Sequence, residues 1–224
     1  MKNQVKGFTL IELLIVIGII AILATVVILT LNPAELLRQA RDSTRTSDFA
    51  TVKSALSLYG ADVSSPYYGT STDPGAVGGA DGWCFISITS GGVVPTTGIT
   101  SCGGRLVTTN IGKVASSTET AKRLVDGTGW IPVNLNQISS GAPISAYPVD
   151  PVSPNSAGTI TTGDDAGILD DRYYVYATDG SGGFVVNTRL ESTKFASSSA
   201  NDGGGGTTIG PLLYQVGTDP GLDL

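Results

Sequence analysis

Histidine is absent from this chain of 224 residues. The commonest general base of enzymes and the commonest nitrogen ligand of zinc are therefore missing. Nucleophilic sites that pair serine or cysteine with histidine are excluded for the same reason. The sequence also contains no phosphate-binding loop and no evident acid–base pair. We therefore predict that the chain is not an enzyme and needs no cofactor.

Cysteine is scarce, with only Cys84 and Cys102 in the whole chain. In an exported domain, two cysteines at this separation favour a single disulfide. Closing a loop of this size stabilises the folded state by about 3 kcal/mol in the chain-entropy model. Two buried free thiols are the alternative.

Charged residues are also few, at 14% of the chain, and the net charge is −6. From Val63 to the end the chain has 7 basic and 14 acidic residues. This acidic balance argues against a broad basic surface for nucleic acid. The chain is instead rich in glycine (30 residues), with 11 prolines and many serines and threonines. Such a composition is typical of a loop-rich, exported β domain.

A long apolar segment lies near the N-terminus. Phe8 to Leu31 is a run of 24 residues in which Glu12 is the only charge. As a helix it would be roughly 36 Å long, enough to cross a hydrocarbon core of about 30 Å. Lys2 and Lys6 precede the run, so the positive-inside rule places this end in the cytoplasm and the remainder outside. The run is longer than a signal-peptide core and no A-x-A-like site follows it, so we expect it to be retained.

A second helix is predicted from Pro33 to about Tyr59. Asn32 and Pro33 suit a helix start, and Glu35 in the first turn complements the helix dipole. The helix carries one apolar stripe, which requires a covering partner. The residues of the stripe are Phe49, Val52, Leu56 and Tyr59. Charged residues are expected on the other faces, namely Arg38, Arg41, Asp42, Arg45 and Asp48.

From residue 61 on, the pattern changes to loops and short strands. Strands are predicted at 83–88, 105–109, 173–178, 184–190 and 211–216, and a short helix at 117–125. The glycine-rich stretch DGSGG joins two of the strands as a hairpin. A long amphipathic helix followed by such a sheet predicts an α+β fold, in which the sheet covers the helix stripe.

The N-terminal stretch Gly7-Phe8-Thr9-Leu10-Ile11-Glu12 follows a short basic leader and opens the apolar helix. It resembles the class III signal of type IV pilins and of type II secretion pseudopilins. The resemblance is strong over residues 1–60. It is weaker in the stretches YPVDPVSPN, YYVYATDG and NTRLES. These stretches resemble segments of pilin-like heads and occur in the same order along the chain.

This resemblance implies the pilin fold, which is a long N-terminal α-helix (about 8–60) with a C-terminal antiparallel β-sheet head packed on its second half. The implied organisation is a leader peptide (1–7), a hydrophobic transmembrane and filament-core helix (8–32), an amphipathic helix packed on the head (33–60) and a β-rich head (61–224).

The resemblance also implies processing of the leader. A prepilin peptidase would cleave between Gly7 and Phe8 and methylate the new amine of Phe8. Glu12 lies one helical turn, about 6 Å, further along, so a neighbouring helix staggered by that amount would bring its amine beside the carboxylate. An unpaired charge in such a place costs roughly 3–5 kcal/mol, so Glu12 is predicted to set the register of a filament. An interfacial Glu12 without a specific partner is the alternative, and whether it meets its own amine or a neighbour's is left open.

The predicted function is therefore that of a structural subunit of a type IV pilus-like extracellular filament. The implied partners are copies of the chain, the prepilin peptidase, an inner-membrane assembly platform and, before assembly, membrane lipid. The precursor would be a single-pass inner-membrane protein with a cytoplasmic N-terminus, and the product a cell-surface filament. The alternatives are a pseudopilin of a type II secretion system and, more remotely, a membrane-tethered binding protein or enzyme.

Two groups of residues in the head have competing interpretations. The loop beginning at YATDG resembles the calcium loop of major pseudopilins at Asp179-Gly180 but lacks the second acidic ligand. No metal site is therefore predicted, and the loop carboxylates are expected to be solvated; they are Asp150, Asp164, Asp165, Asp170, Asp171 and Asp179. Core packing is expected for the aromatic residues, in preference to an exposed aromatic surface; they are Trp83, Trp130, Tyr173, Tyr174 and Tyr176.

Overall fold

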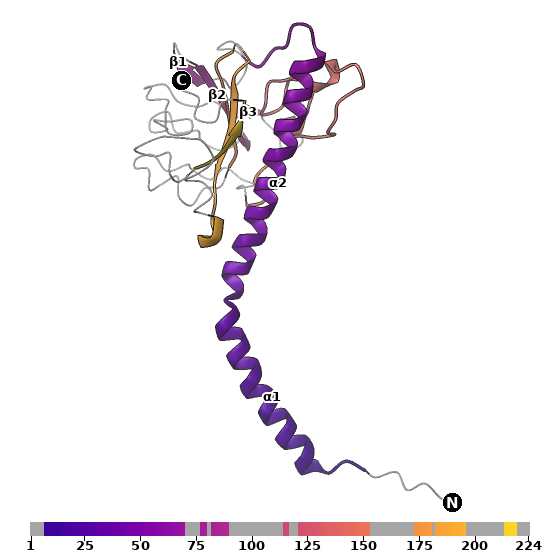
Figure 1. The fold of residues 1–224 in the computed structure, drawn as a ribbon, viewed down its shortest axis with the longest axis vertical. Coiled ribbons are helices and arrows are strands. Elements are labelled where there is room, and N and C mark those ends of the chain that lie inside the picture. The colour runs from indigo at the N-terminus through magenta and orange to yellow at the C-terminus, as the bar shows by residue number, and fades with distance from the viewer. Residues whose placement is uncertain are drawn as a thin grey trace, which may run out of the picture.

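Two consecutive helices, α1 (Leu10–Leu31) and α2 (Pro33–Asp62), form a long rod in the computed structural model. The globular head is packed on α2, whereas α1 projects away from the head toward the N-terminus (Figure 1). The structure describes residues 7–69, 77–79, 82–89, 114–116, 121–152, 173–180, 182–195 and 213–218.

The rod is interrupted at Asn32 and Pro33. Asn32 has a left-handed backbone (φ 40°, ψ 74°), the only positive φ of a non-glycine residue in the described ranges. A proline disfavours helical backbone at the preceding residue and has no N–H to continue the helix. Pro33 is, however, well suited to a first helical turn, and the carbonyl of Asn32 accepts from the N–H groups of Glu35 and Leu36 at 3.0 and 3.3 Å. These two residues therefore end one helix and start the next.

The head contains one mainly antiparallel sheet. Its strands are β1 (Val77–Gly79), β2 (Gly82–Thr89), β3 (Val114–Ser116), β4 (Val175–Thr178), β5 (Phe184–Arg189) and β6 (Leu213–Gly217). The order is β1-β2-β4-β5-β6, and β3 pairs in parallel with the second half of β2. In this register Tyr176 lies opposite Phe85 on one side and Val186 on the other. This row of the sheet therefore contributes two aromatic and two valine side chains to the core, since Val186 in turn lies opposite Val216.

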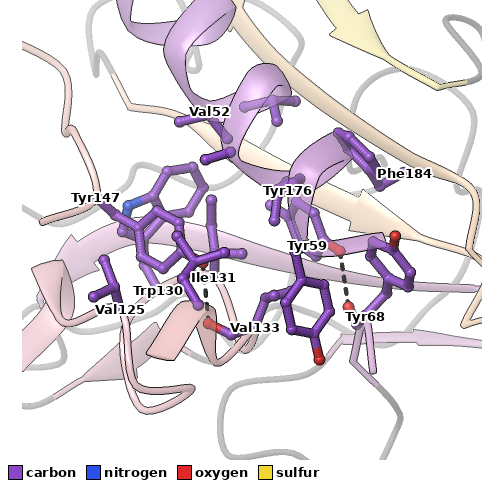
Figure 2. Close-up of a cluster of buried hydrophobic side chains, with 14 of the residues drawn as sticks. Val52, Tyr59, Tyr68, Val125, Trp130, Ile131, Val133, Tyr147, Tyr176 and Phe184 are labelled. Carbon is purple, nitrogen blue, oxygen red and sulfur yellow. Dashed lines mark hydrogen bonds between the residues drawn. The ribbon is translucent and has the colours of Figure 1, made fainter. Parts of the chain in front are cut away.

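The core lies between α2, the sheet and the segment that contains the two short 3-10 helices η1 (Ala121–Arg123) and η2 (Leu135–Gln137). The predicted stripe of α2 is completely buried in it. Figure 2 shows how the buried tyrosines satisfy their hydroxyl groups. The Tyr176 hydroxyl donates to the carbonyl of Tyr68 at 2.8 Å, and that of Tyr147 donates to Val133 at 3.0 Å. Large rings thus fill the core without leaving a polar atom unpaired at these positions.

Most of the sequence-based expectations for the fold are confirmed. The architecture is α+β, with the sheet packed on the second half of the long helical rod. The strands expected at 83–88, 173–178, 184–190 and 211–216 correspond to β2, β4, β5 and β6. Burial is confirmed for Trp130, Tyr173, Tyr174 and Tyr176, while the side chain of Trp83 lies outside the described part.

Other expectations need correction. β1 and β3 were not predicted, because three-residue strands such as VGG carry no alternating pattern and glycine is depleted in strands. In the region expected to be a helix at 117–125, the described part is helical only as the single 3-10 turn η1. The expected strand at 105–109 lies outside the described residues.

The prediction that the charged residues of α2 avoid the buried face is wrong for Asp42 and Arg45. Both side chains are fully buried. Their spacing continues the apolar stripe by about two further turns, in the order Asp42, Arg45, Phe49, Val52, Leu56 and Tyr59. The stripe therefore changes from apolar to ionic toward the end of α2 that adjoins α1.

Arg45 is buried among carboxylates from three parts of the chain. Its Nε and Nη2 atoms donate to the two oxygens of Asp150 at 2.7 and 2.9 Å, and its Nη1 donates to Asp42 at 2.8 Å. Its Nη2 also lies 2.6 Å from Glu191, which Arg41 binds as well. We call Arg41, Asp42, Arg45, Asp150 and Glu191 the Arg45 cluster. The expectation that Asp150 is solvated is therefore wrong, because the tertiary fold brings an arginine to it.

The Arg45 cluster also binds backbone. Asp42 accepts from the N–H groups of Glu191 at 3.0 Å and of Ser192 at 2.7 Å. About two turns earlier on α2, Glu35 accepts from both the N–H and the hydroxyl of Thr193 at 2.9 Å. The segment that follows β5 is therefore attached to the first half of α2 by carboxylates.

Two arginines keep Glu191 of this cluster ionised. Burial raises the pKa of Glu191, but hydrogen bonds from Arg41 and Arg45 outweigh burial and lower that pKa to about 2. A carboxyl group whose pKa is lowered on folding stabilises the fold above its unfolded pKa, here 4.5. That stabilisation is lost only as the pH falls from about 4.5 toward 2.

We expect Arg45→Met to lower the free energy of unfolding of the head by roughly 3–5 kcal/mol, because it leaves several buried carboxylates without their cation. Urea titration of the full chain in detergent, followed by the fluorescence of buried Trp130, measures the change. Arg38→Met is the matched control, since Arg38 is 52% exposed and lies 3.8 Å from Glu35. A loss for Arg45→Met no larger than for the control would contradict the role of the cluster.

Candidate functional site

The surface of α1 is apolar on every side. The large apolar side chains between Phe8 and Ile28 are 46–81% exposed. Within the described residues, Leu10–Ile28 is the one helical stretch with the length and apolar composition to cross a membrane. A helix that is apolar all round is stable only in an apolar environment. The described part of the head covers none of this stretch, so an apolar environment from another molecule would suit it.

The residues just before α1 are open to an external partner. Gly7, Phe8 and Thr9 are non-helical and exposed, and Phe8 is 81% exposed. A Cβ atom added at Gly7 would meet no other atom within 4 Å. The packing of this chain therefore does not require glycine at position 7, and the backbone there can be approached closely.

Glu12 is held by Thr9 in a reciprocal capping box at the start of α1. One carboxylate oxygen, Oε2, accepts from the Thr9 N–H at 2.9 Å and from the Thr9 hydroxyl at 2.7 Å. The Thr9 hydroxyl oxygen in turn accepts from the N–H of Glu12 at 3.3 Å. Among the described residues, nothing donates a hydrogen bond to the other oxygen, Oε1.

This arrangement explains how an apolar helix carries a carboxylate. An ionised side chain within a membrane segment is expensive unless it finds partners. Here two donors of the same chain compensate one oxygen, while the second oxygen stays open. Thr9 is not among the predicted site residues, although a threonine followed three residues later by glutamate before an apolar run is the pattern of a capping box.

The other predicted site residues lie in the head. Cys84 is in β2, where its backbone pairs with Val77 and Ala177, and Cys102 lies outside the described residues. The Oδ1 atom of Asp179 accepts from the N–H of Gly183 at 2.9 Å, so this carboxylate closes the hairpin between β4 and β5.

Four of the acidic residues that are expected to be solvated lie between Pro151 and Tyr173 in the sequence. Asp164, Asp165, Asp170 and Asp171 lie outside the described residues. In the part of the chain that the structure does describe, no three or more acidic or cysteine side chains form a group that could hold a metal ion.

Comparison with known proteins bears on the N-terminal segment alone. Residues 2–28 match the family described as the prokaryotic N-terminal methylation motif. No curated protein and no solved structure matches the chain. The matched range includes Gly7, Phe8 and Glu12, whose individual roles remain predictions. The chain thus carries the N-terminal methylation motif, which is the class III signal of type IV pilins and pseudopilins, and this motif supports a pilin-like or pseudopilin-like precursor anchored by its apolar helix.

Proposed function

We propose that this protein is the structural subunit of a type IV pilus-like extracellular filament. The observation that supports the proposal best is the junction of a methylation motif, an all-round apolar helix and a head that packs only on α2. Such a helix suits two environments in turn. Lipid surrounds it before assembly, and the same helix of other copies surrounds it in the filament core. A structural role of this kind needs neither a catalytic residue nor a cofactor.

The organisation of the chain follows from these two environments. The leader (1–7) carries the lysines that keep the N-terminus in the cytoplasm, and the helix from 8 to 32 spans the inner membrane. The amphipathic helix (33–60) and the head (61–224) then lie outside. The Arg45 cluster supports this division, because it attaches the head beyond Pro33 and leaves the preceding helix uncovered.

Processing by a prepilin peptidase is the next step of the proposal. The enzyme cleaves between Gly7 and Phe8 and methylates the Phe8 amine, so that an inner-membrane assembly platform can take up the mature chain. The open backbone at Gly7 supports this assignment. Cleavage also removes Lys2 and Lys6 and leaves a single positive amine at the edge of the apolar helix.

Glu12 is the proposed register mark of the filament, and its geometry favours the amine of a neighbouring subunit. Phe8 precedes an extended N-cap residue, Thr9 (φ −82°, ψ 148°), and no hydrogen bond joins the described atoms of Phe8 and Glu12. The free oxygen of Glu12 lies about one helical turn from Phe8, so a neighbour staggered by about 6 Å presents its amine there. An ion pair in an apolar core penalises other registers, because a mispaired carboxylate would be left buried.

A disulfide between Cys84 and Cys102 belongs to the same proposal, since the head would fold in an oxidising compartment. We expect both thiols to resist alkylation until the unfolded chain is reduced, and reduction to lower the stability of the head by about 3 kcal/mol. Intact-mass measurement before and after reduction tests this pairing. Alkylation of both cysteines without reduction would contradict it.

We expect the mature protein to begin at Phe8 and to carry one methyl group on its amine. Mass spectrometry of the N-terminal peptide from membranes and from sheared cell-surface material measures both modifications. Gly7→Leu should block cleavage and leave the precursor in the membrane, whereas Gly18→Ala, within α1 and also in open space, should be processed normally. A chain that keeps Met1 in cells that assemble filaments would refute the proposed processing.

We expect Glu12→Ala to be cleaved normally but to give at least about 100-fold less fibre, because roughly 3–5 kcal/mol of register energy is lost at each subunit contact. Electron microscopy and quantitative blotting of sheared material measure the yield. Thr25→Ala is the control in the same helix, since the Thr25 hydroxyl donates to its own Ala21 carbonyl at 2.9 Å. Normal fibres from Glu12→Ala would overturn the register assignment. Wild-type fibres confined beneath the cell surface would favour a secretion pseudopilin.

A further inference from the structure

The carboxylate of a glutamate defines the stagger between subunits poorly unless its position is restricted. Its side chain has several rotatable bonds, and an unrestricted carboxylate samples many positions around the helix. A contact that distinguishes one stagger from the next needs the charged atom at a defined place. The structure supplies this restriction through Thr9.

Two donors of Thr9 converge on one oxygen of Glu12. The N–H and the hydroxyl of Thr9 both bind Oε2, at 2.9 and 2.7 Å. The donors are themselves well fixed, because the N-cap backbone is extended and the β-branched side chain has few rotamers. The N–H of Glu12 closes the ring of contacts on the Thr9 hydroxyl oxygen at 3.3 Å.

The consequence is an asymmetric carboxylate. Oε2 is bound to its own helix, whereas Oε1 receives no hydrogen bond from the residues that the structure describes. The side chain of Glu12 is at the same time exposed in the single chain. The position of the free oxygen relative to the helix is therefore restricted, and the oxygen is accessible to another molecule.

We propose that Thr9 is a positioning residue for filament assembly: it fixes the carboxylate of Glu12 on its own helix so that the free oxygen is aimed at the amine of a neighbouring subunit. The inference rests on the proposed register function of Glu12 and adds a residue to it. Thr9 does not compete with the amine, because the two partners use different oxygens. The same contacts stabilise the carboxylate while the subunit is stored in lipid.

This role differs from simple helix capping. Glycine is tolerated at the N-cap almost as well as threonine, so Thr9→Gly keeps the helix start and the N–H donor but removes the hydroxyl. Thr9→Val keeps the shape of the side chain and removes the hydroxyl as both donor and acceptor. Thr9→Ser restores the hydroxyl. A residue that only caps the helix would tolerate glycine, whereas a positioning residue requires the hydroxyl.

The experiment measures fibre yield for each amount of correctly cleaved full-length subunit. It also measures the cross-link that a carbodiimide forms between the Glu12 carboxyl and an amine of another subunit. We expect normal cleavage in all three variants. In Thr9→Val and Thr9→Gly, both the fibre yield and the Glu12 cross-link should be lowered at least about tenfold. This factor corresponds to the loss of one hydrogen bond to a charged group. Thr9→Ser should match the wild type in both measurements.

The outcomes separate this inference from the function on which it rests. Wild-type fibre yield and cross-linking in Thr9→Gly and Thr9→Val, together with lost fibres in Glu12→Ala, would overturn the role of Thr9 alone. Loss in Thr9→Val but not in Thr9→Gly would reduce Thr9 to a helix cap and would also overturn the inference. Normal fibres in Glu12→Ala would instead remove the register function itself.

Discussion

The position of the head on the rod depends on the burial of one guanidinium group. Arg45 on α2 meets carboxylates from its own helix, from the loop at Asp150 and from Glu191 in the segment that follows β5. A buried ion pair adds little net stability over an apolar contact, but it tolerates few alternative geometries, because each misplacement leaves a charge unpaired. The cluster thus specifies where the head is attached. Among the described residues, the apolar stretch Leu10–Ile28 stays uncovered by the head.

The two halves of the rod have surfaces that suit different environments. α2 buries one stripe and exposes polar faces, as expected for a helix at the surface of a globular head. α1 exposes apolar side chains all round and has no polar face to offer to water. The boundary lies at Asn32 and Pro33, where the chain leaves helical geometry for one residue. A single rod therefore presents an apolar surface at one end and carries the packed head at the other.

Glu12 is compatible with an apolar environment because its first partners belong to its own chain. Thr9 compensates one carboxylate oxygen before any other subunit is present, and the other oxygen stays available. In the proposed function, the same carboxylate is compensated in lipid by Thr9 and binds a neighbouring amine in the filament. One oxygen thus belongs to the cap of α1, and the other is available for the proposed contact with a neighbouring subunit.

The sequence by itself determined the elements whose physics is local. The apolar run, the break at Asn32-Pro33, the stripe from Phe49 to Tyr59 and the methylation motif all depend on near neighbours along the chain, as does the capping pattern that places Thr9 beside Glu12. Only the tertiary structure decided that Asp42, Arg45 and Asp150 are buried, because charged residues look solvated until distant segments bring them a partner. It also decided the short strands β1 and β3, since their pairing with β2 compensates for three-residue sequences without strand character of their own.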